Sequence, residues 1–573
     1  MRILSTLLIL TILCPTFAWA EDTAALSQEV QNELTTQANA ARRQLEAIPL
    51  KPDEKPEIEL EEKKETKIIE GETGPTFFVK KINIQGNTII PSSVLKETVS
   101  AFENRKATFS HLRSFSEIVT NAYRAQGYLT SRAYLPPQTI EDGQVTVKVL
   151  EGKVGKIFVE GNKYFSKESY EKYMKFGSLR VFRYQDLERD LYMLNRRPDR
   201  KAKAFLIAGE ALGSSDIILK VKDSNPFHAY YSFSNRGTKL THRSRHSLNL
   251  NHNNFLGLDD TLNMSYTLAE QGTFGGGSFY YDLPVADTPI NITLSGGYVK
   301  TILAKHLSIA EIKGESTSFS PSISYAIVQR PDQTISVNLG LDFVNSISRI
   351  NDIQTSADRV RTLHLGPRIA IQDMGGRSIL SGDVHVGLPG FLSGLERDDE
   401  SSTVENTGGD FLYYTGSVTR IQRLPETMFL VMKMNGQWTR DTLVSVEQFR
   451  AGGSSSVRGY PESDAGGDYG WGAGAELNIP IFGLPKTWTV PYTKKTWKES
   501  LRLVGFAEMA KTYFRERSFS TSVKDKTLIG AGFGTRFNID DNVSIEADFG
   551  WPLGDDSVDE NQGQTHLSMR AGF

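Results

Sequence analysis

Histidine, serine and glycine are the residue types whose spacing in this sequence could indicate catalysis or cofactor binding. The nine histidines contain no H-E-x-x-H pair and no other metal-ligand spacing, and no G-x-S-x-G nucleophile turn occurs. The glycine runs at 470–474 and 530–534 neither open a helix nor supply the Lys-Ser/Thr pair of a phosphate loop. We therefore expect no catalytic residue, no cofactor and no metal. We interpret these glycines as places where strands bend or a loop packs closely.

The N-terminal segment predicts export. Arg2 precedes an apolar stretch, and Ala18-Trp19-Ala20 is the small-residue pattern of a cleavage site, so residues 1–20 indicate a secretory signal peptide. The alternative is an apolar first helix of the fold. Cleavage removes Cys14, the single cysteine, which excludes disulfides, thiolate metal sites and a cysteine nucleophile from the mature chain.

The charge and hydropathy of the chain limit the classes of partner and of membrane attachment that are compatible with the sequence. The formal net charge is −3, with both signs spread along the chain, which argues against nucleic acid as a partner. After the signal there is no apolar run long enough for a transmembrane helix. An exported chain of this kind is either soluble or a β-barrel, and only strand periodicity separates these two classes.

The next segments differ sharply in composition. Residues 21–49 predict a helix, because Ala, Gln, Glu, Leu and Arg dominate and neither Gly nor Pro interrupts them before Ile48. Residues 50–75 are rich in Glu, Lys and Pro, which predicts a solvated, extended linker.

A tandem repeat follows. Residues 76–152 predict the order β-α-α-β-β, and residues 153–224 repeat it. Each copy opens with a strand that ends at a Gly-Asn pair, Gly86-Asn87 and Gly161-Asn162. The chain therefore carries two small α/β domains rather than one large domain.

From residue 225 onward the sequence alternates apolar and polar side chains. One such segment is 335–343, and several segments have the length of about nine or ten residues that a tilted strand needs to cross a bilayer. The last strand ends on Phe573, an aromatic terminus typical of an outer-membrane barrel. With about 22 residues per strand and connection, residues 225–573 predict a transmembrane antiparallel barrel of about 16 strands.

The most specific residues lie in one loop of this region. Glu447-Gln448-Phe449, Gly452-Gly453 and Val457-Arg458-Gly459-Tyr460 resemble the E-Q-F…G-G…V-R-G-Y signature of two-partner-secretion transporters of the hemolysin-activator type. The resemblance extends over nearly the whole mature chain. It identifies the two repeats with POTRA (polypeptide-transport-associated) domains, and residues 21–49 with the family's plug helix.

In this family the arginine of the loop pairs with an acid in an F-x-D-x-G block on a later strand. Here the block reads from Phe506 to Ala510, with Glu508 in place of Asp and Ala510 in place of Gly. We expect Arg458 to contact Glu508 inside the barrel, with a gross attraction of about 4 kcal/mol at 4 Å before desolvation. The alternative is an arginine that lies in solvent on a mobile loop.

The resemblance implies an outer-membrane transporter with its N-terminal domains in the periplasm. Its partners would be a large, unfolded, β-helix-like exoprotein, outer-membrane lipid, and the barrel-assembly machinery during biogenesis. A barrel-assembly insertase of the same superfamily and a plugged diffusion channel are the alternatives. Two tandem POTRA domains and the V-R-G-Y loop favour the exporter. An enzymatic barrel would need a catalytic triad in its lumen or at its rim. The sequence shows no motif for one, so its members would have to be scattered along the chain.

Overall fold

The computed structural model describes residues 57–60, 75–175, 180–285, 288–303, 311–485, 487–491, 493, 495–515, 524–539, 542–557 and 563–572. The expected signal peptide (1–20), helix (21–49) and C-terminal Phe573 lie outside these residues, as does most of the expected linker. The described residues form two compact units, one within Lys51–Pro226 and one within Phe227–Phe573, and each is considered by itself. Among the helices of the described part, none is long and apolar enough to span a membrane.

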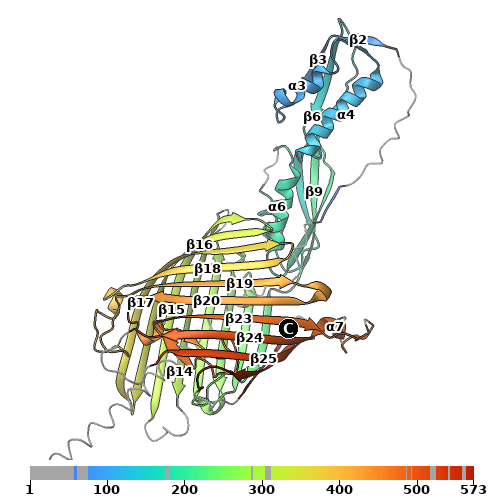
Figure 1. The fold of residues 1–573 in the computed structure, drawn as a ribbon. Coiled ribbons are helices and arrows are strands. Elements are labelled where there is room, and N and C mark those ends of the chain that lie inside the picture. The colour runs from blue at the N-terminus through green and yellow to red at the C-terminus, as the bar shows by residue number, and fades with distance from the viewer. Residues whose placement is uncertain are drawn as a thin grey trace, which may run out of the picture. The chain divides into compact units, whose positions relative to one another are not determined.

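The first small α/β domain packs helices on a three-stranded sheet (Figure 1). The sheet order is β3-β6-β5, with β3 parallel to β6. Helix α4 buries Leu112, Phe115, Val119 and Tyr123, which the helical period places on one face. The elements are β2 (Phe77–Val79), β3 (Lys81–Gln85), α3 (Ser92–Ser100), β4 (Arg105–Ala107), α4 (Phe109–Ala125), β5 (Arg132–Tyr134) and β6 (Gln144–Leu150). The short pair β2–β4 was not expected from the sequence.

The second domain repeats this plan. Its elements are β7 (Lys153–Glu160), α5 (Glu168–Glu171), α6 (Tyr184–Asn195), β8 (Arg200–Ala208) and β9 (Ser214–Asp223). A core that includes Phe182, Leu187 and Leu191 lies between α6 and the sheet. Each domain has its own buried cluster, which is what two independent small domains require.

A carboxylate holds the same turn in both domains. In the first, Glu151 accepts the backbone N–H groups of Thr88 and Ile89 and the hydroxyl of Tyr123. In the second, Asp223 accepts the N–H groups of residues 163–165 and the hydroxyl of Tyr170. The glycine before each turn has a positive φ, and a Cβ there would strike a carbonyl of the last strand. The repeat predicted from the Gly-Asn pairs is therefore a repeat of hydrogen bonds as well.

Part of the linker is a strand, which corrects the expectation that all of it is solvated. Strand β1 (Ile58–Leu60) pairs in parallel with β8, so the sheet order is β1-β8-β9-β7. Ile58 packs against the core of the second domain, and Lys203 forms a salt bridge with Glu57. Ile58 and Leu60 are only two apolar residues in a Glu-rich stretch, which is too short a pattern from which to predict such a strand.

The remaining chain is a closed antiparallel barrel of 16 strands, as the sequence predicted (Figure 1). Strand β10 pairs with β11 on one side and with β27 on the other, so no edge is left open. The strands are β10 (Phe227–Ser234), β11 (Arg245–Asn253), β12 (Thr261–Ala269), β13 (Phe274–Pro284), β14 (Ile290–Ile302), β15 (Ile312–Gln329), β16 (Gln333–Ile350), β17 (Ile353–Asp373), β18 (Gly376–Gly387), β19 (Leu412–Arg423), β20 (Phe429–Thr439), β23 (Tyr469–Pro480), β24 (Leu501–Tyr513), β25 (Lys526–Asn538), β26 (Ser544–Pro552) and β27 (Gln564–Gly572).

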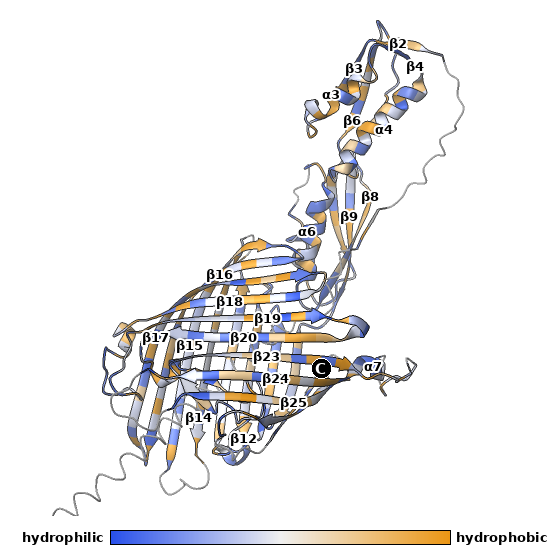
Figure 2. Ribbon diagram, in the orientation of Figure 1, coloured by the Kyte–Doolittle hydropathy of each residue, from blue (hydrophilic) through white to orange (hydrophobic). Residues whose placement is uncertain are grey.

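The two faces of the barrel wall differ in chemistry. Along β12, Met264, Tyr266 and Leu268 are exposed on the outward face. Ser265 and Thr267 alternate with them and form hydrogen bonds with neighbouring strands at 2.8 and 2.7 Å between oxygens. Figure 2 shows the resulting alternation of hydrophobic and hydrophilic residues along the barrel strands. An apolar exterior with a polar interior is the pattern of a barrel in lipid.

The connections contain short elements that the sequence did not predict. They are the 3-10 helices η1 (Glu270–Gly272), η3 (Phe391–Ser393), η4 (Pro425–Thr427) and η5 (Ser445–Glu447), the helix α7 (Trp497–Ser500), and the strand pair β21 (Phe449–Ala451) and β22 (Ala465–Gly467).

The turn carboxylates make the stability of the N-terminal unit depend on pH. Partial burial opposes ionisation, but hydrogen bonds from the Lys163 amide and the Tyr170 hydroxyl lower the pKa of Asp223 below its ordinary value. Likewise, despite burial, the Thr88 hydroxyl and amide lower the pKa of Glu151. A carboxyl with a lowered folded-state pKa stabilises above its ordinary pKa of about 4, and this contribution disappears as the pH falls through the lower value.

We therefore predict that Asp223→Asn lowers the free energy of unfolding of residues 51–226 by about 1–3 kcal/mol at pH 7, measured by urea denaturation. The loss should shrink as the pH falls toward 2, because the wild-type carboxyl is then protonated as well. Glu160→Gln, on an exposed position of β7, is the control and should change little. An Asp223→Asn loss of equal size at low pH would contradict the carboxylate mechanism.

Candidate functional site

The candidate site is a long segment, residues 440–468, which joins β20 to β23 and lies against the inner face of the barrel wall. Its strands β21 and β22 pack with Ala510 of β24 and Leu528 of β25 in one buried cluster. On β24, Phe506 and Ala510 face this segment and are buried, whereas Leu503 is exposed on the outward face. We call residues 440–468 the lumen loop.

Glycines allow this close approach. Gly459 has a φ of 108°, and a Cβ there would lie 2.7 Å from the carbonyl carbon of Trp551. On the facing strands, a Cβ at Gly550 would lie 2.7 Å from the carbonyl carbon of Arg458, and one at Gly530 would meet its carbonyl oxygen. The glycine run at 530–534 was expected to allow either strand bending or close packing of a loop, and Gly530 lies where the loop touches the wall.

Arg458 and Glu508 form the centre of the site. The Nη2 of Arg458 donates to Oε1 of Glu508 at 2.6 Å, and its Nε donates to the same oxygen at 3.0 Å. The backbone N–H of Arg458 donates to Oε2 at 2.7 Å. Glu508 therefore binds both the side chain and the main chain of the loop. The side chains of Arg458 and Glu508 are 5% and 11% exposed, so the alternative of a solvated loop arginine does not hold.

Three further charges complete the cluster. Nη1 of Arg458 lies 2.7 Å from an oxygen of Glu476 and 3.3 Å from one of Asp548. Arg536 also binds both acids, at 3.2 and 2.5 Å. Two guanidinium groups thus face three carboxylates from β23, β24 and β26. Because each buried charge has hydrogen-bonded partners, the cluster offsets the desolvation that an isolated pair would leave uncompensated.

The other residues singled out in the sequence lie around this cluster. The guanidinium carbon of Arg458 is 3.5 Å from the ring centroid of Phe506, a cation–π contact. Val457 and Tyr460 are buried. The hydroxyl of Tyr460 accepts the N–H of Gly554 at 2.9 Å and donates to the carbonyl of Asp555 at 3.2 Å. Phe573, the expected barrel signal, is outside the described residues.

The lumen loop has a second attachment that the sequence analysis did not predict. Glu447, in the E-Q-F part of the motif, accepts hydrogen bonds from the hydroxyls of Tyr413 on β19 at 2.5 Å and Thr362 on β17 at 3.3 Å. Gln437 on β20 donates to the Glu447 carbonyl at 2.8 Å. The loop is therefore attached to two parts of the barrel wall. Hydroxyl groups on β17 and β19 bind Glu447, and carboxylates on β23, β24 and β26 bind Arg458.

One group of side chains next to this attachment has the composition of a metal site. Asp342, His364 and His385 come from β16, β17 and β18, and their ligand atoms lie within 4.8 Å of one another. Nδ1 of His364 is 2.8 Å from Asp342, and the ring of His385 stacks on Tyr413 with centroids 4.3 Å apart. Linear spacing could not reveal this group, because cross-strand register brings its members together.

The sequence analysis did not predict the other charged residues of the cluster, for the same physical reason. Glu476, Asp548 and Arg536 lie on three separate strands, and their alignment follows from strand register rather than from any sequence motif. Each of them is a charged residue at an inward position of an alternating strand. Small or neutral polar residues are also compatible with such positions, and the charge is the only signal that the sequence gives.

Comparisons with family models and with known proteins point to the same family of secretion proteins. Residues 213–494 match the family described as haemolysin secretion/activation protein ShlB/FhaC/HecB, and residues 77–152 match the POTRA domain of ShlB type. The heme/hemopexin transporter protein HuxB of Haemophilus influenzae is 22% identical over 564 residues, which cover 96% of this chain and 97% of that protein. The outer membrane transporter CdiB of Escherichia coli O6:K15:H31 is 24% identical over 73% of this chain and 72% of its own length.

Solved structures agree on the fold. CdiB from Escherichia coli superposes with a TM-score of 0.67 at 20% identity, over 96% of this chain and 99% of that chain. BamA from Haemophilus ducreyi lacking POTRA domains 1–3 superposes with a TM-score of 0.52 at 14% identity, over 87% of this chain and all of that chain. At these identities the likeness concerns the fold alone.

We predict that Arg458→Lys loosens the lumen loop although the charge is kept. Lysine cannot form the forked hydrogen bonds to Glu508 or stack on Phe506 in the same way. Cleavage within residues 452–466 by a nonspecific protease, in detergent-solubilised protein, should become about tenfold faster, equivalent to a loss of about 1.4 kcal/mol. The control is Arg440→Lys, at an exposed loop arginine, where no change is expected. Equal cleavage rates in the two variants would contradict the anchoring role of the fork.

Proposed function

Because this chain belongs to the haemolysin secretion/activation family of outer-membrane transporters, we propose that it captures an extended exoprotein in the periplasm with its two POTRA domains. The barrel then passes that exoprotein to the cell surface. The barrel lies in the outer membrane and the N-terminal domains lie in the periplasm. The single observation that carries the proposal is the lumen loop, anchored by Arg458 and Glu508 inside a barrel that follows two POTRA domains.

The second POTRA domain supports capture by strand addition. Its edge strand β8 already pairs with β1, a short extended segment of this same chain. Main-chain pairing of this kind needs no particular sequence, and pockets for alternate side chains add selectivity. We infer that an extended segment of the exoprotein adds to the edge of β8 in place of β1. Its chemistry is that of an unfolded chain with β-forming side chains, the form that a large β-helix-like protein has before it folds.

The lumen loop supports passage through the barrel. A 16-stranded barrel has a lumen wider than its wall side chains can fill, and this loop occupies part of that space. Besides the apolar contacts of β21 and β22, buried ion pairs and hydrogen bonds hold it, and water can replace their partners when the loop leaves the wall. Movement needs no nucleotide in this scheme, because folding of the exoprotein outside the cell removes the unfolded form and biases transport outward.

Other functions have weaker support. The barrel superposes on that of BamA, but this is a likeness of fold, and the two relatives described above are named as transporters. A diffusion channel has no use for a strand-binding edge in the periplasm. We also propose that the barrel-assembly machinery inserts this barrel, as it does outer-membrane barrels in general.

Capture can be tested on residues 51–226, which contain both buried cores. We predict that Ile58→Asp frees the β8 edge, because a charge replaces a side chain that packs on the core. Binding of a urea-unfolded N-terminal exoprotein fragment, measured by fluorescence anisotropy, should become tighter than for the wild type, and the folded fragment should not bind. Leu212→Asp, at a residue 86% exposed, is the control. Unchanged or weaker binding by Ile58→Asp would refute competition for this edge.

Passage can be tested at the ionic cluster. Arg458→Ala and Glu508→Ala should each reduce the exoprotein secreted into the medium, while the barrel stays inserted and resistant to heat on gels. Arg458→Ala should be the more severe, because it leaves three carboxylates facing Arg536 alone. The double variant should be little worse than Arg458→Ala, since both changes break one contact.

Glu508→Asp is the conservative variant for that experiment. It restores the residue that the family uses, but the shorter side chain has to reach both the guanidinium and the backbone N–H of Arg458. We expect a mild loss of secretion. Additive losses in the Arg458/Glu508 double variant would mean that the two residues act separately, and the anchored-loop mechanism would be rejected.

A further inference from the structure

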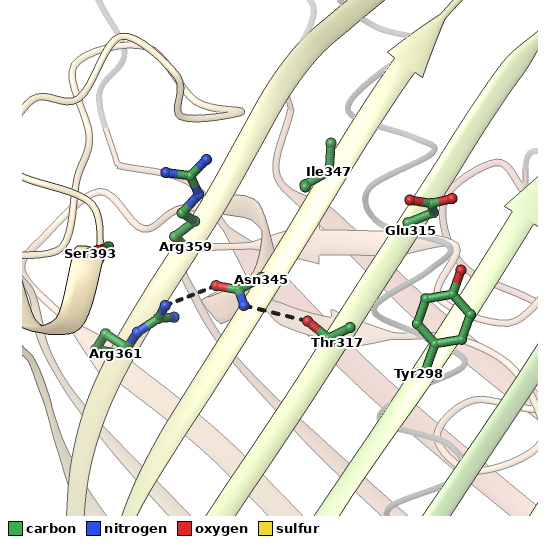
Figure 3. Close-up of a pocket in the computed structure, with 8 residues that line it drawn as sticks. All are labelled: Tyr298, Glu315, Thr317, Asn345, Ile347, Arg359, Arg361 and Ser393. Carbon is green, nitrogen blue, oxygen red and sulfur yellow. Dashed lines mark hydrogen bonds between the residues drawn. The ribbon is translucent and has the colours of Figure 1, made fainter. Parts of the chain in front are cut away.

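A cavity of about 370 Å³, lined mostly by residues with polar side chains, lies on the wall formed by β14, β15, β16 and β17. Its lining includes Tyr298, Glu315, Asn345, Arg359 and Arg361 (Figure 3). No step of the proposed secretion mechanism uses these residues. The cavity volume falls in the range of sites for small ligands or headgroups.

The cavity opens on the outward face of the barrel. On β17, residues 359 and 361 alternate with Thr362, whose hydroxyl contacts the lumen loop inside. They share their face with Leu365, which is exposed. On β16, Asn345 likewise shares its face with the exposed Leu339. Side chains on one face of a strand recur every second residue, so Arg359, Arg361 and Asn345 lie on the side of the barrel that faces lipid.

The height of the cavity along the barrel follows from the chain path. The first strand begins at Phe227, directly after the periplasmic domains, so successive hairpins alternate between the periplasmic end and the cell-surface end. The turn at Asn351–Asp352 between β16 and β17 is therefore at the cell surface. On β17, Arg359 and Arg361 lie seven and nine residues from Asp352, and 14 and 12 residues from the periplasmic end of the strand at Asp373. At about 3.3 Å per residue on a tilted strand, this places them at the level of the outer leaflet.

Aromatic side chains mark the membrane boundary at this height. Tyr298, Phe319 and Phe391 are 46%, 43% and 42% exposed on the outward face. The ring of Phe343 lies between those of Phe319 and Phe391, with centroids 6.4 Å from each. Aromatic girdles occur where the hydrocarbon meets the headgroups. The cavity thus lies at headgroup level.

The two arginines of the cavity lack acidic partners. Arg361 is only 7% exposed, and it donates to the carbonyl of Val344 at 3.1 Å and to Oδ1 of Asn345 at 2.9 Å. Its Nε is buried without a hydrogen-bond partner. Within the described residues, no carboxylate lies at salt-bridge distance from Arg359 or Arg361. The cavity's own acid, Glu315, is neutralised by Arg349 at 2.8 Å.

We propose that this cavity binds a phosphate group on the headgroup of an outer-leaflet glycolipid, of the lipid A type. Guanidinium groups match the geometry of a phosphate and bind it with charge-assisted hydrogen bonds. Asn345, Thr317 and Tyr298 lie in a row on the strands next to the arginines, and they offer groups that suit sugar hydroxyls (Figure 3). A bound phosphate supplies the negative charge that Arg361 lacks within the protein. The site anchors the barrel wall in the outer leaflet, on the side of β17 opposite to the lumen loop.

The test uses the full-length protein in detergent and lipid A as the probe, with retention of bound lipid measured by native mass spectrometry. Arg361→Gln and Arg359→Gln should each weaken lipid A binding about tenfold, since each removes charge-assisted hydrogen bonds. Arg420→Gln is the matched control, because Arg420 lies on the outward face of β19 at the periplasmic end and pairs with Asp373. It should bind lipid A as the wild type does. Heat resistance on gels verifies that each barrel is folded.

Two further arms separate the sources of the phosphate. Dephosphorylated lipid A should bind the wild type as weakly as lipid A binds the double Arg359/Arg361 variant. Inorganic phosphate at the same concentration should not displace lipid A, because the acyl chains and the aromatic girdle hold the headgroup in place. Equal binding of lipid A by the variants and the wild type, equal binding of dephosphorylated lipid A, or full displacement by inorganic phosphate would each overturn the proposal.

Discussion

Pairing of β10 with β27 closes the barrel, and the other features of this unit depend on that closure. Inside a bilayer no water is present to bind an open sheet edge, so every backbone donor and acceptor of the wall must be paired within the protein. Sixteen strands satisfy this requirement but enclose a lumen that inward side chains cannot fill. The lumen loop enters this space, and glycines at 530 and 550 leave room for its backbone against the wall. Closure therefore creates both the pathway and the need for an element that occupies it.

The chemistry that holds the lumen loop suits an element that has to move. Apolar contacts of β21 and β22 with Ala510 and Leu528 hold part of the loop, and they would expose hydrophobic surface whenever the loop left the wall. In addition, Arg458 binds carboxylates on three strands, and Glu447 binds hydroxyls on two others. When such groups separate, water can replace each partner, so the difference in free energy between the held and released loop stays small. The same polar lining remains compatible with an extended polypeptide in the lumen.

The features that the sequence predicts depend on residues close together in the sequence, whereas the features that it does not predict depend on residues far apart in the sequence. The small α/β domains and the antiparallel barrel of about 16 strands follow from local periodicity and segment length, and the structure agrees with them. The place of Glu508 followed from a family motif. Strand β1 and the acids Glu476 and Asp548 did not follow, because two apolar residues in a charged linker and single charges on alternating strands give too weak a local signal. Register between distant strands determines what these residues meet, and no window of sequence contains that register.

The period of two along each strand also separates the two environments of the barrel. On β17, Thr362 and His364 face the lumen, where Thr362 reaches the loop, while Arg359 and Arg361 face the outer leaflet. A one-residue shift in register would exchange these faces and place two arginines without acidic partners in the lumen beside the loop's own charges. The hydrogen bonds that fix β17 between β16 and β18 therefore do more than close the wall. They keep two arginines without acidic partners out of the lumen, where Glu447 of the loop accepts a hydrogen bond from Thr362 of the same strand.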